Sequence, residues 1–174
     1  MYPTKVERQL QRGAVTLTEV EWYLHHRLRV RGHAAFVKGA SPTPGGTSPE
    51  TSPQRERAAY LVSRMVGLDG LVPETVLSPG QTVSVQRFVR GKWPRFARVD
   101  VSVLELFDYI IANTDRHSGN WFVAERSKWG MWAIDNAYSF SRDQAQAPPR
   151  YLVVLPSVAQ QVGYLLTDNE RIHR

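Results

Sequence analysis

The chain has 174 residues, a formal net charge of +6 and 42% hydrophobic residues. This length suits one domain, or two small lobes that share a cleft, and it is enough to bury a core. The absence of cysteine excludes disulfides and thiolate metal sites and fits a cytoplasmic location. No window approaches the roughly 20 apolar residues of a transmembrane segment, and the amino terminus lacks the apolar core of a signal peptide.

Basic residues concentrate in two stretches, 5–31 and 87–98. Such a positive balance favours anionic partners such as a nucleotide, an anionic lipid or a nucleic acid, although an ordinary solvated basic surface explains it equally well. No specific nucleic-acid motif accompanies the charge, and the histidines match no common zinc pattern.

The amino-terminal segment gives few structural signals. Residues 15–17 and 20–24 could form two strands, and a helix over 18–29 fits almost as well. A loop that covers phosphate needs glycine, because backbone amides approach phosphate closely only where no Cβ intervenes. The best candidate is 11–16, QRGAVT, which contains Gly13 but no G-x-G pattern.

Two regular elements flank a long polar segment. Residues 34–38, AAFVK, form an apolar run that ends in a lone lysine, which is typical of a strand. Residues 54–67 carry apolar side chains at helical spacing, and Gly67 is a plausible stop. Between them, 39–54 is rich in Pro, Gly, Ser and Thr, a composition that predicts a mobile insertion.

The second half of the chain alternates helix and strand signals. Residues 82–91 alternate apolar and polar side chains and predict a strand, whereas 103–111 have the spacing of a helix. Two short apolar runs at 121–123 and 131–134 predict a hairpin. Farther on, 145–150 reads as a loop and 156–166 as a helix.

A polar loop, NTDRHSGN at 113–120, lies between the second helix and the hairpin, and Ile134-Asp135-Asn136 follows the hairpin. This order brings Asp115, Asn120 and Asp135 to the edges of adjacent turns. Three oxygen-bearing side chains can converge there on a hard cation and a phosphate. The alternative is an ordinary turn, since Asp and Asn favour turns in any fold.

The pattern D-R-H-x-x-N, then a hairpin, then I-D-N, resembles the catalytic core of the atypical kinases. These include the phosphatidylinositol 3-/4-kinase-like superfamily, with its HipA-like and type II phosphatidylinositol 4-kinase-like branches. The resemblance implies an α+β, protein-kinase-like fold of two lobes. A small β-rich N-lobe would span 1–90, and a reduced helical C-lobe would span 91–174, with a catalytic loop at 113–120 and a metal-binding segment at 134–136.

The resemblance also implies roles in the polar loop. Asp115 would position or deprotonate the acceptor hydroxyl, and Asn120 and Asp135 would bind Mg²⁺, for which Mn²⁺ could substitute. Arg116 and His117 would brace the loop. Phosphoryl transfer depends on positioning and on neutralising the charge of the phosphates, which these residue types can provide.

In the amino-terminal half, Lys38 would neutralise the phosphates of ATP and Glu56 would orient Lys38. Gln86, Phe88 and Val89 would lie at the adenine. Each residue taken alone has an ordinary explanation: a lysine often ends a strand in solvent, and a glutamate near a helix start complements the helix dipole.

The resemblance therefore implies a kinase that uses ATP, with a protein hydroxyl favoured over a lipid because the sequence contains no membrane-inserting hydrophobic loop. A phosphatidylinositol kinase is the alternative acceptor class. A pseudokinase that binds nucleotide without transfer is the alternative activity. Because the C-lobe is short, a partner chain could complete it.

Overall fold

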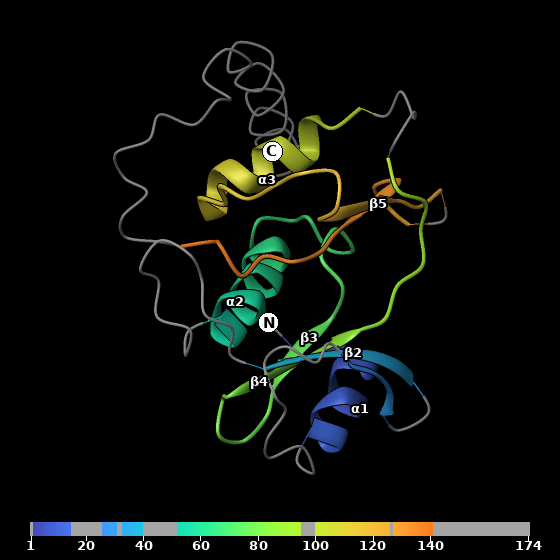
Figure 1. Cartoon of the computed structure of the whole chain (residues 1–174), viewed down its shortest axis with the longest axis vertical. Coiled ribbons are helices and arrows are strands. Elements are labelled where there is room, and N and C mark those ends of the chain that lie inside the picture. The colour runs from blue at the N-terminus through green and yellow to red at the C-terminus, as the bar shows by residue number, and fades with distance from the viewer. Residues whose placement is uncertain are drawn as a thin grey trace, which may run out of the picture.

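The structure, a computed structural model, describes residues 2–14, 26–30, 33–39, 52–94, 100–125 and 127–140. Within these ranges the elements, in chain order, are α1 (Lys5–Ala14), β1 (His26–Val30), β2 (His33–Gly39), α2 (Ser52–Met65), β3 (Thr75–Leu77), β4 (Val83–Arg87), α3 (Ser102–Ile111), β5 (Trp121–Val123) and β6 (Met131–Ala133). The arrangement is mixed α+β and compatible with a kinase-like fold, which confirms the predicted fold class (Figure 1).

Four of the strands form an antiparallel sheet in the order β1-β2-β4-β3. Strand β2 lies inside this sheet, and its side chains alternate between two faces. Ala35 and Val37 are buried in one core with Leu10 of α1, while Phe36 and Lys38 are only partly buried. Helix α1 lies against one face of the sheet (Figure 1). The pleat therefore directs Lys38 to the opposite face.

A second core joins α2, α3 and the β5-β6 hairpin. Its fully buried members include Ala59, Phe107, Ile111 and Met131. In α3 the predicted apolar spacing is the spacing of the buried face. In α2 the buried face instead includes Glu56 and Ser63, and Met65 is exposed. Helix α2 ends as expected near Gly67, which has φ of 80°, a left-handed conformation that glycine adopts at little cost.

The insertion predicted over 39–54 is too long at both ends, because the neighbouring elements extend into it. Gly39 still belongs to β2, and 52–54 form the first turn of α2. Pairing with β4 explains the first difference, because Gly39 lies opposite Val83 in the ladder. The rest of the predicted insertion, 40–51, lies outside the described residues, as do 15–25, the loop at 145–150 and the helix at 156–166.

The predicted phosphate-covering loop at 11–16 is wrong over its first four residues, which form the last turn of α1. The start of this helix is stabilised by a reciprocal capping box. The backbone N–H of Thr4 donates to Glu7 Oε2 at 3.2 Å, and the N–H of Glu7 donates to Thr4 Oγ1 at 3.0 Å. The alternative helix at 18–29 is also wrong at its end, because β1 begins at His26.

The strand predicted over 82–91 is shorter, since β4 ends at Arg87. The chain then leaves the sheet and pairs with the hairpin: Lys92 and Val123 exchange two backbone hydrogen bonds of 2.9 and 2.8 Å. Gly91 permits this approach, because a Cβ there would lie 2.4 Å from Phe122 Cβ. The segment after β4 is therefore fixed against β5.

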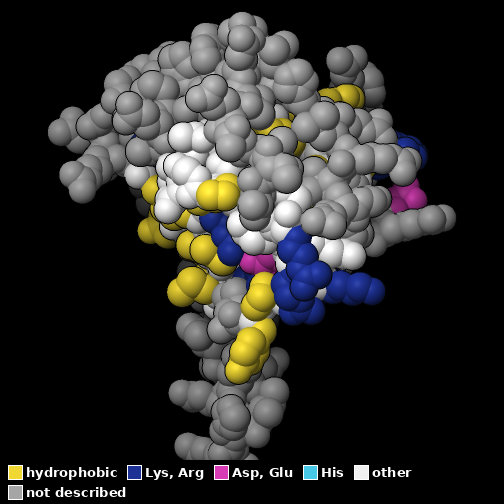
Figure 2. All heavy atoms as spheres, turned by 90° about the horizontal axis from the view of Figure 1, so that it is seen from below, with side chains coloured by type: hydrophobic (Ala, Val, Ile, Leu, Met, Phe, Trp, Pro, Cys, Tyr) yellow, Lys and Arg dark blue, Asp and Glu magenta, His cyan; other side chains and the backbone are white. Residues whose placement is uncertain are grey.

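Figure 2 shows the molecule from below relative to Figure 1. On this face, Lys and Arg side chains gather around a small group of acidic side chains. This agrees with the positive balance of the sequence. None of the helices in the described ranges is long and apolar enough to cross a membrane.

Candidate active site

The polar loop begins where α3 ends. Ala112 has φ of 49°, a left-handed conformation, and its N–H bonds the carbonyl oxygens of Asp108 and Tyr109. Asn113 then accepts a hydrogen bond from the Asp115 N–H on its side-chain oxygen, at 3.1 Å. This turn leaves the Asp115 side chain 42% exposed, so a large acceptor molecule could reach it.

Arg116 is the central support of the loop, and its side chain is only 5% exposed. Its Nε and Nη2 atoms donate to the carboxylate of Asp108 at 2.9–3.2 Å. Its Nη1 atom donates to the carbonyl oxygens of Asn120 and Ile134, and Nη2 also donates to Asn136 Oδ1. The guanidinium is thus occupied by the protein itself and serves as a brace.

The Asp108 carboxylate is 1% exposed. Burial raises its pKa above the ordinary value, and the attraction and hydrogen bonds of Arg116 and Asn113 only partly offset this. A buried ion pair of this kind contributes little net stability, but removing one partner leaves an uncompensated charge. Asp108 and Arg116 therefore depend on each other.

Asn120 connects the loop to the second acidic segment. Its Nδ2 donates to the backbone oxygen of Asp115 at 2.8 Å and to Asp115 Oδ2 at 3.2 Å. Because the amide nitrogen is used in this way, the side-chain oxygen Oδ1 is the atom that can bind a cation. The Asn120 carbonyl accepts from the Ile134 N–H at 3.1 Å, which brings Asp135 next to Asn120.

His117 is 61% exposed. Its Nδ1 accepts the N–H of Gly119 at 3.0 Å, so the neutral ring carries its proton on Nε2. Nε2 lies 4.0 Å from Asp115 Oδ2, beyond a direct hydrogen bond. The imidazole therefore lies near the Asp115 carboxylate, which the family resemblance would place at the acceptor hydroxyl.

Lys38 joins the two halves of the structure. Its Nζ lies 2.7 Å from Glu56 Oε1 and 2.7 Å from Asp135 Oδ1. The lysine side chain is 12% exposed and Glu56 is 2% exposed. The other Glu56 oxygen accepts the Asn136 N–H at 3.1 Å. The pairing of Lys38 with Glu56 that the resemblance implied is thus present.

Burial disfavours the charged form of Lys38, but the carboxylates of Glu56 and Asp135 outweigh it and raise the lysine pKa. A raised folded-state pKa means that this ion pair contributes its full stability below the unfolded pKa of a lysine, roughly 10.4, and loses it only at more alkaline pH. Lys38 is therefore a permanent cation at every pH used for enzyme assays.

Beside Lys38 lies a cavity of about 320 Å³. Its lining residues come from the four-stranded sheet, the segment after β4 and the hairpin: Phe36, Lys38, Gln86, Arg87, Phe88, Val89, Trp93, Gly119, Phe122, Ile134 and Asp135. The rings of Trp93 and Phe122 contact each other, with centroids 4.4 Å apart. All three residues predicted to lie at the adenine line this cavity. The Gln86 side chain, however, turns to Thr75, to which its Nε2 donates at 2.9 Å.

The metal prediction rests on a small set of oxygen atoms. Within the described ranges no group of three or more His, Cys, Asp and Glu side chains is placed to hold a metal ion. One carboxylate and one amide oxygen, from Asp135 and Asn120, nevertheless suit magnesium, which usually keeps several waters. The donor set thus fits Mg²⁺.

Sequence reasoning gave no individual role to several residues of the site, although Asn113 and Asn136 lie in the predicted loop and acidic segment. Asp108, Asn113 and Asn136 support the loop and are nearly or fully buried, and Trp93 and Phe122 line the cavity. A signal for Asp108 existed: an acid within the apolar face of a helix is rarely buried without a partner, and Arg116 is the next basic residue along the chain.

The mixed α+β arrangement around this site is compatible with a kinase-like fold. Residues 92–158 match the family model for phosphatidylinositol 3- and 4-kinase. The search of the curated proteins found no match. The matched region contains the polar loop, the hairpin and Asp135, and it supports the phosphatidylinositol 3-/4-kinase-like superfamily and a phosphotransferase activity. Lys38 and Glu56 lie outside it, so their assignment depends on the geometry.

Proposed function

We propose that this protein is an ATP- and magnesium-dependent phosphotransferase that moves the γ-phosphate to a hydroxyl group. One observation carries the proposal: Lys38 Nζ lies 2.7 Å from both Glu56 and Asp135, at the edge of a cavity with aromatic walls. In protein kinases a lysine paired with a helix glutamate binds the nucleotide phosphates, and a nearby aspartate binds the magnesium.

The cavity supports a nucleotide as the ligand. Its volume of about 320 Å³ is at the lower end of small-molecule sites. Phe36 and Phe122 line it from the sheet and the hairpin, and aromatic faces suit a purine ring. With the base beside these rings, the phosphates would extend toward Lys38 and Asp135.

The transfer step follows from the loop. The acceptor oxygen would attack the γ-phosphorus, the bond from that phosphorus to the bridging oxygen would break, and ADP would leave. Asp115 would take the proton of the hydroxyl, while Arg116 would keep the loop in place. Bound magnesium neutralises charge on the phosphates, and Asn120 and Asp135 would supply its protein ligands.

We favour a protein hydroxyl as the acceptor because the sequence offers no hydrophobic loop for insertion into a membrane. A phosphatidylinositol head group is the second candidate, and the family match at 92–158 favours it. Both acceptors present a hydroxyl to the same carboxylate, so the chemistry proposed for Asp115 is common to them.

The experiment is phosphate transfer from γ-labelled ATP with magnesium, run in parallel on casein, on phosphatidylinositol vesicles and without acceptor. We expect label on protein, and a loss of about 10²–10⁴-fold in Asp115→Asn if the carboxylate acts as a general base. Glu125→Gln, the same change on an exposed turn, is the matched control.

The outcomes separate the candidates. Label on lipid alone would change the acceptor class and leave the activity standing. Nucleotide binding without label in any reaction would identify a pseudokinase. Transfer that survives in Asp115→Asn would contradict the role of Asp115.

A further inference from the structure

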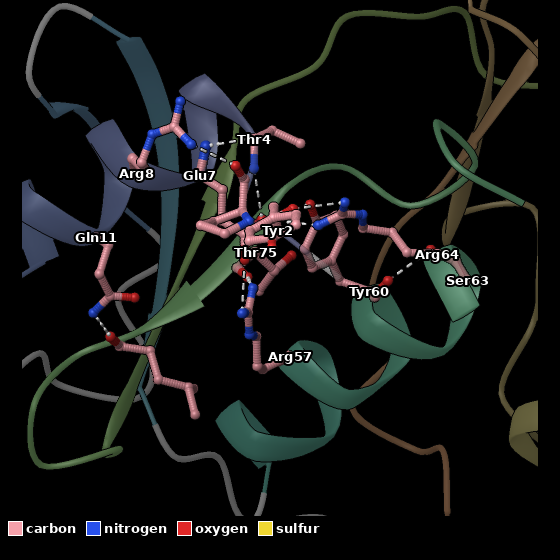
Figure 3. A network of polar contacts seen from close by, with 12 residues as sticks. Tyr2, Thr4, Glu7, Arg8, Gln11, Arg57, Tyr60, Ser63, Arg64 and Thr75 are labelled. Atoms are coloured by element: carbon pink, nitrogen blue, oxygen red, sulfur yellow. Dashed lines mark hydrogen bonds and ion pairs between the residues drawn. The ribbon is translucent and has the colours of Figure 1, made fainter. Parts of the chain in front are cut away.

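A second polar network lies between α1 and α2 and centres on Glu7 (Figure 3). Glu7 is 4% exposed. Its Oε1 lies 2.7 Å from Arg57 Nη2. Its Oε2 accepts from Arg64 Nη1 at 3.2 Å and from the Tyr60 hydroxyl at 3.1 Å. One carboxylate thus binds three side chains of a single helix.

The same carboxylate caps its own helix, because Oε2 also accepts the Thr4 N–H. Burial alone would raise the pKa of Glu7, but the hydrogen bond and charge of Arg57, with the Thr4 and Tyr60 bonds, lower it. Glu7 is therefore an ionised link between α1 and α2.

Helix α1 is in turn fixed to the sheet that carries Lys38. Leu10 is fully buried in one core with Val37 and Val85. Gln11 Nε2 donates to the backbone oxygen of Leu77 at 3.0 Å. Glu7 is therefore a fixed point on the sheet, and it holds α2 at a set distance from that sheet.

The residues that contact Glu7 are close to Glu56 along α2. Arg57 directly follows Glu56. Tyr60 lies one turn after Glu56, on the same side of the helix as Glu56. Arg57 also donates to the backbone oxygen of Thr75 in β3. Without the Glu7 carboxylate, Arg57 and Arg64 would lose the acceptor that they share, and α2 would lose its charged contact with α1.

We propose that Glu7 is a positioning residue that sets the place of α2 and so keeps Glu56 in contact with Lys38. The expected effect of Glu7 on nucleotide affinity rests on the proposed function. Its effect on the position of Glu56 does not, because Glu56 also accepts the Asn136 N–H at 3.1 Å. Exchange of that amide reports the position of Glu56 without any ligand.

The first test is amide hydrogen exchange at Asn136 in the whole chain, measured by NMR on wild type, Glu7→Gln and Glu125→Gln. The glutamine keeps the shape of Glu7 and removes its charge, and Glu125→Gln makes the same change on an exposed turn outside the Glu7 network. We expect exchange at Asn136 to rise about tenfold in Glu7→Gln alone, as loss of a charge-assisted bond allows. The Ala133 amide, which bonds the Leu71 oxygen, is the internal reference and should not change.

Equal increases at Asn136 and Ala133 would mean a general loss of stability and would overturn the proposal, as would no change at Asn136. If Glu7→Gln does not fold, Tyr60→Phe takes its place, because it removes one donor to Glu7 from α2 and keeps the ring. The expected effect is in the same direction and smaller.

The second test is a double-mutant cycle on the ATP dissociation constant with Glu7→Gln and Glu56→Gln. If Glu7 acts through Glu56, Glu7→Gln should weaken ATP binding several-fold in the wild-type background and less than about twofold in Glu56→Gln. The same factor in both backgrounds would overturn the proposal. Wild type that binds no ATP, with selective exchange at Asn136, would refute the proposed function and leave the positioning role standing.

Discussion

Replacing Asp108 with alanine should lower the free energy of unfolding by about 3–5 kcal/mol, the usual cost of breaking a buried ion pair. The Arg116 side chain is only 5% exposed, and the variant removes the Asp108 carboxylate that balances its charge. Arg116 also holds the backbone oxygens of Asn120 and Ile134, so the polar loop should loosen as well. Urea denaturation measures the loss directly.

Glu105→Ala is the matched control, since it removes the same charge from the same helix. Burial and the nearby carboxylates of Asp100 and Asp108 raise the Glu105 pKa, so its removal should change stability by no more than about 0.5 kcal/mol. Equal losses in Asp108→Ala and Glu105→Ala would show that Arg116 does not depend on Asp108.

Lys38→Met should reduce phosphate transfer by about 10²–10³-fold, the range found when one preorganised electrostatic contact is removed. Methionine keeps an unbranched apolar side chain and removes the cation that lies 2.7 Å from Glu56 and Asp135. Turnover with saturating ATP, together with the ATP dissociation constant, separates a binding defect from a defect in the transfer step.

Lys5→Met is the control for Lys38→Met, because Lys5 is an exposed residue of α1 and the change in net charge is the same. It should leave turnover unchanged. A Lys38→Met variant that transfers phosphate at the rate of Lys5→Met would remove Lys38 from the proposed site.

The elements that could be predicted from sequence are those whose signals are local. Helices α2 and α3 have buried residues at helical spacing, and the β5-β6 hairpin is formed by two short apolar runs. A glycine at position 67 marks the end of α2. Helix α1 was missed because Val6 and Leu10 are its only large apolar residues. Its clearest signal was the capping box from Thr4 to Glu7.

The site was harder to predict because its contacts cross the chain. Lys38 meets Asp135 across 97 positions, a contact that was not predicted, since the family resemblance paired Lys38 only with Glu56. Asp108 lies among apolar residues of α3. The spacing of those apolar residues already predicted the helix, so it gave no reason to assign Asp108 a role. Partners of buried charges are set by tertiary packing, which a local pattern does not contain.

Thermal unfolding with and without ATP and magnesium, on wild type and Asp135→Asn, tests the central claim most directly. At about 100 times its dissociation constant, ATP should stabilise wild type by about 2.7 kcal/mol, which raises Tm by about 5–10 °C. The magnesium-dependent part of this shift should disappear in Asp135→Asn. No shift in wild type, or a shift that needs neither magnesium nor Asp135, would contradict a nucleotide site between Lys38 and Asp135.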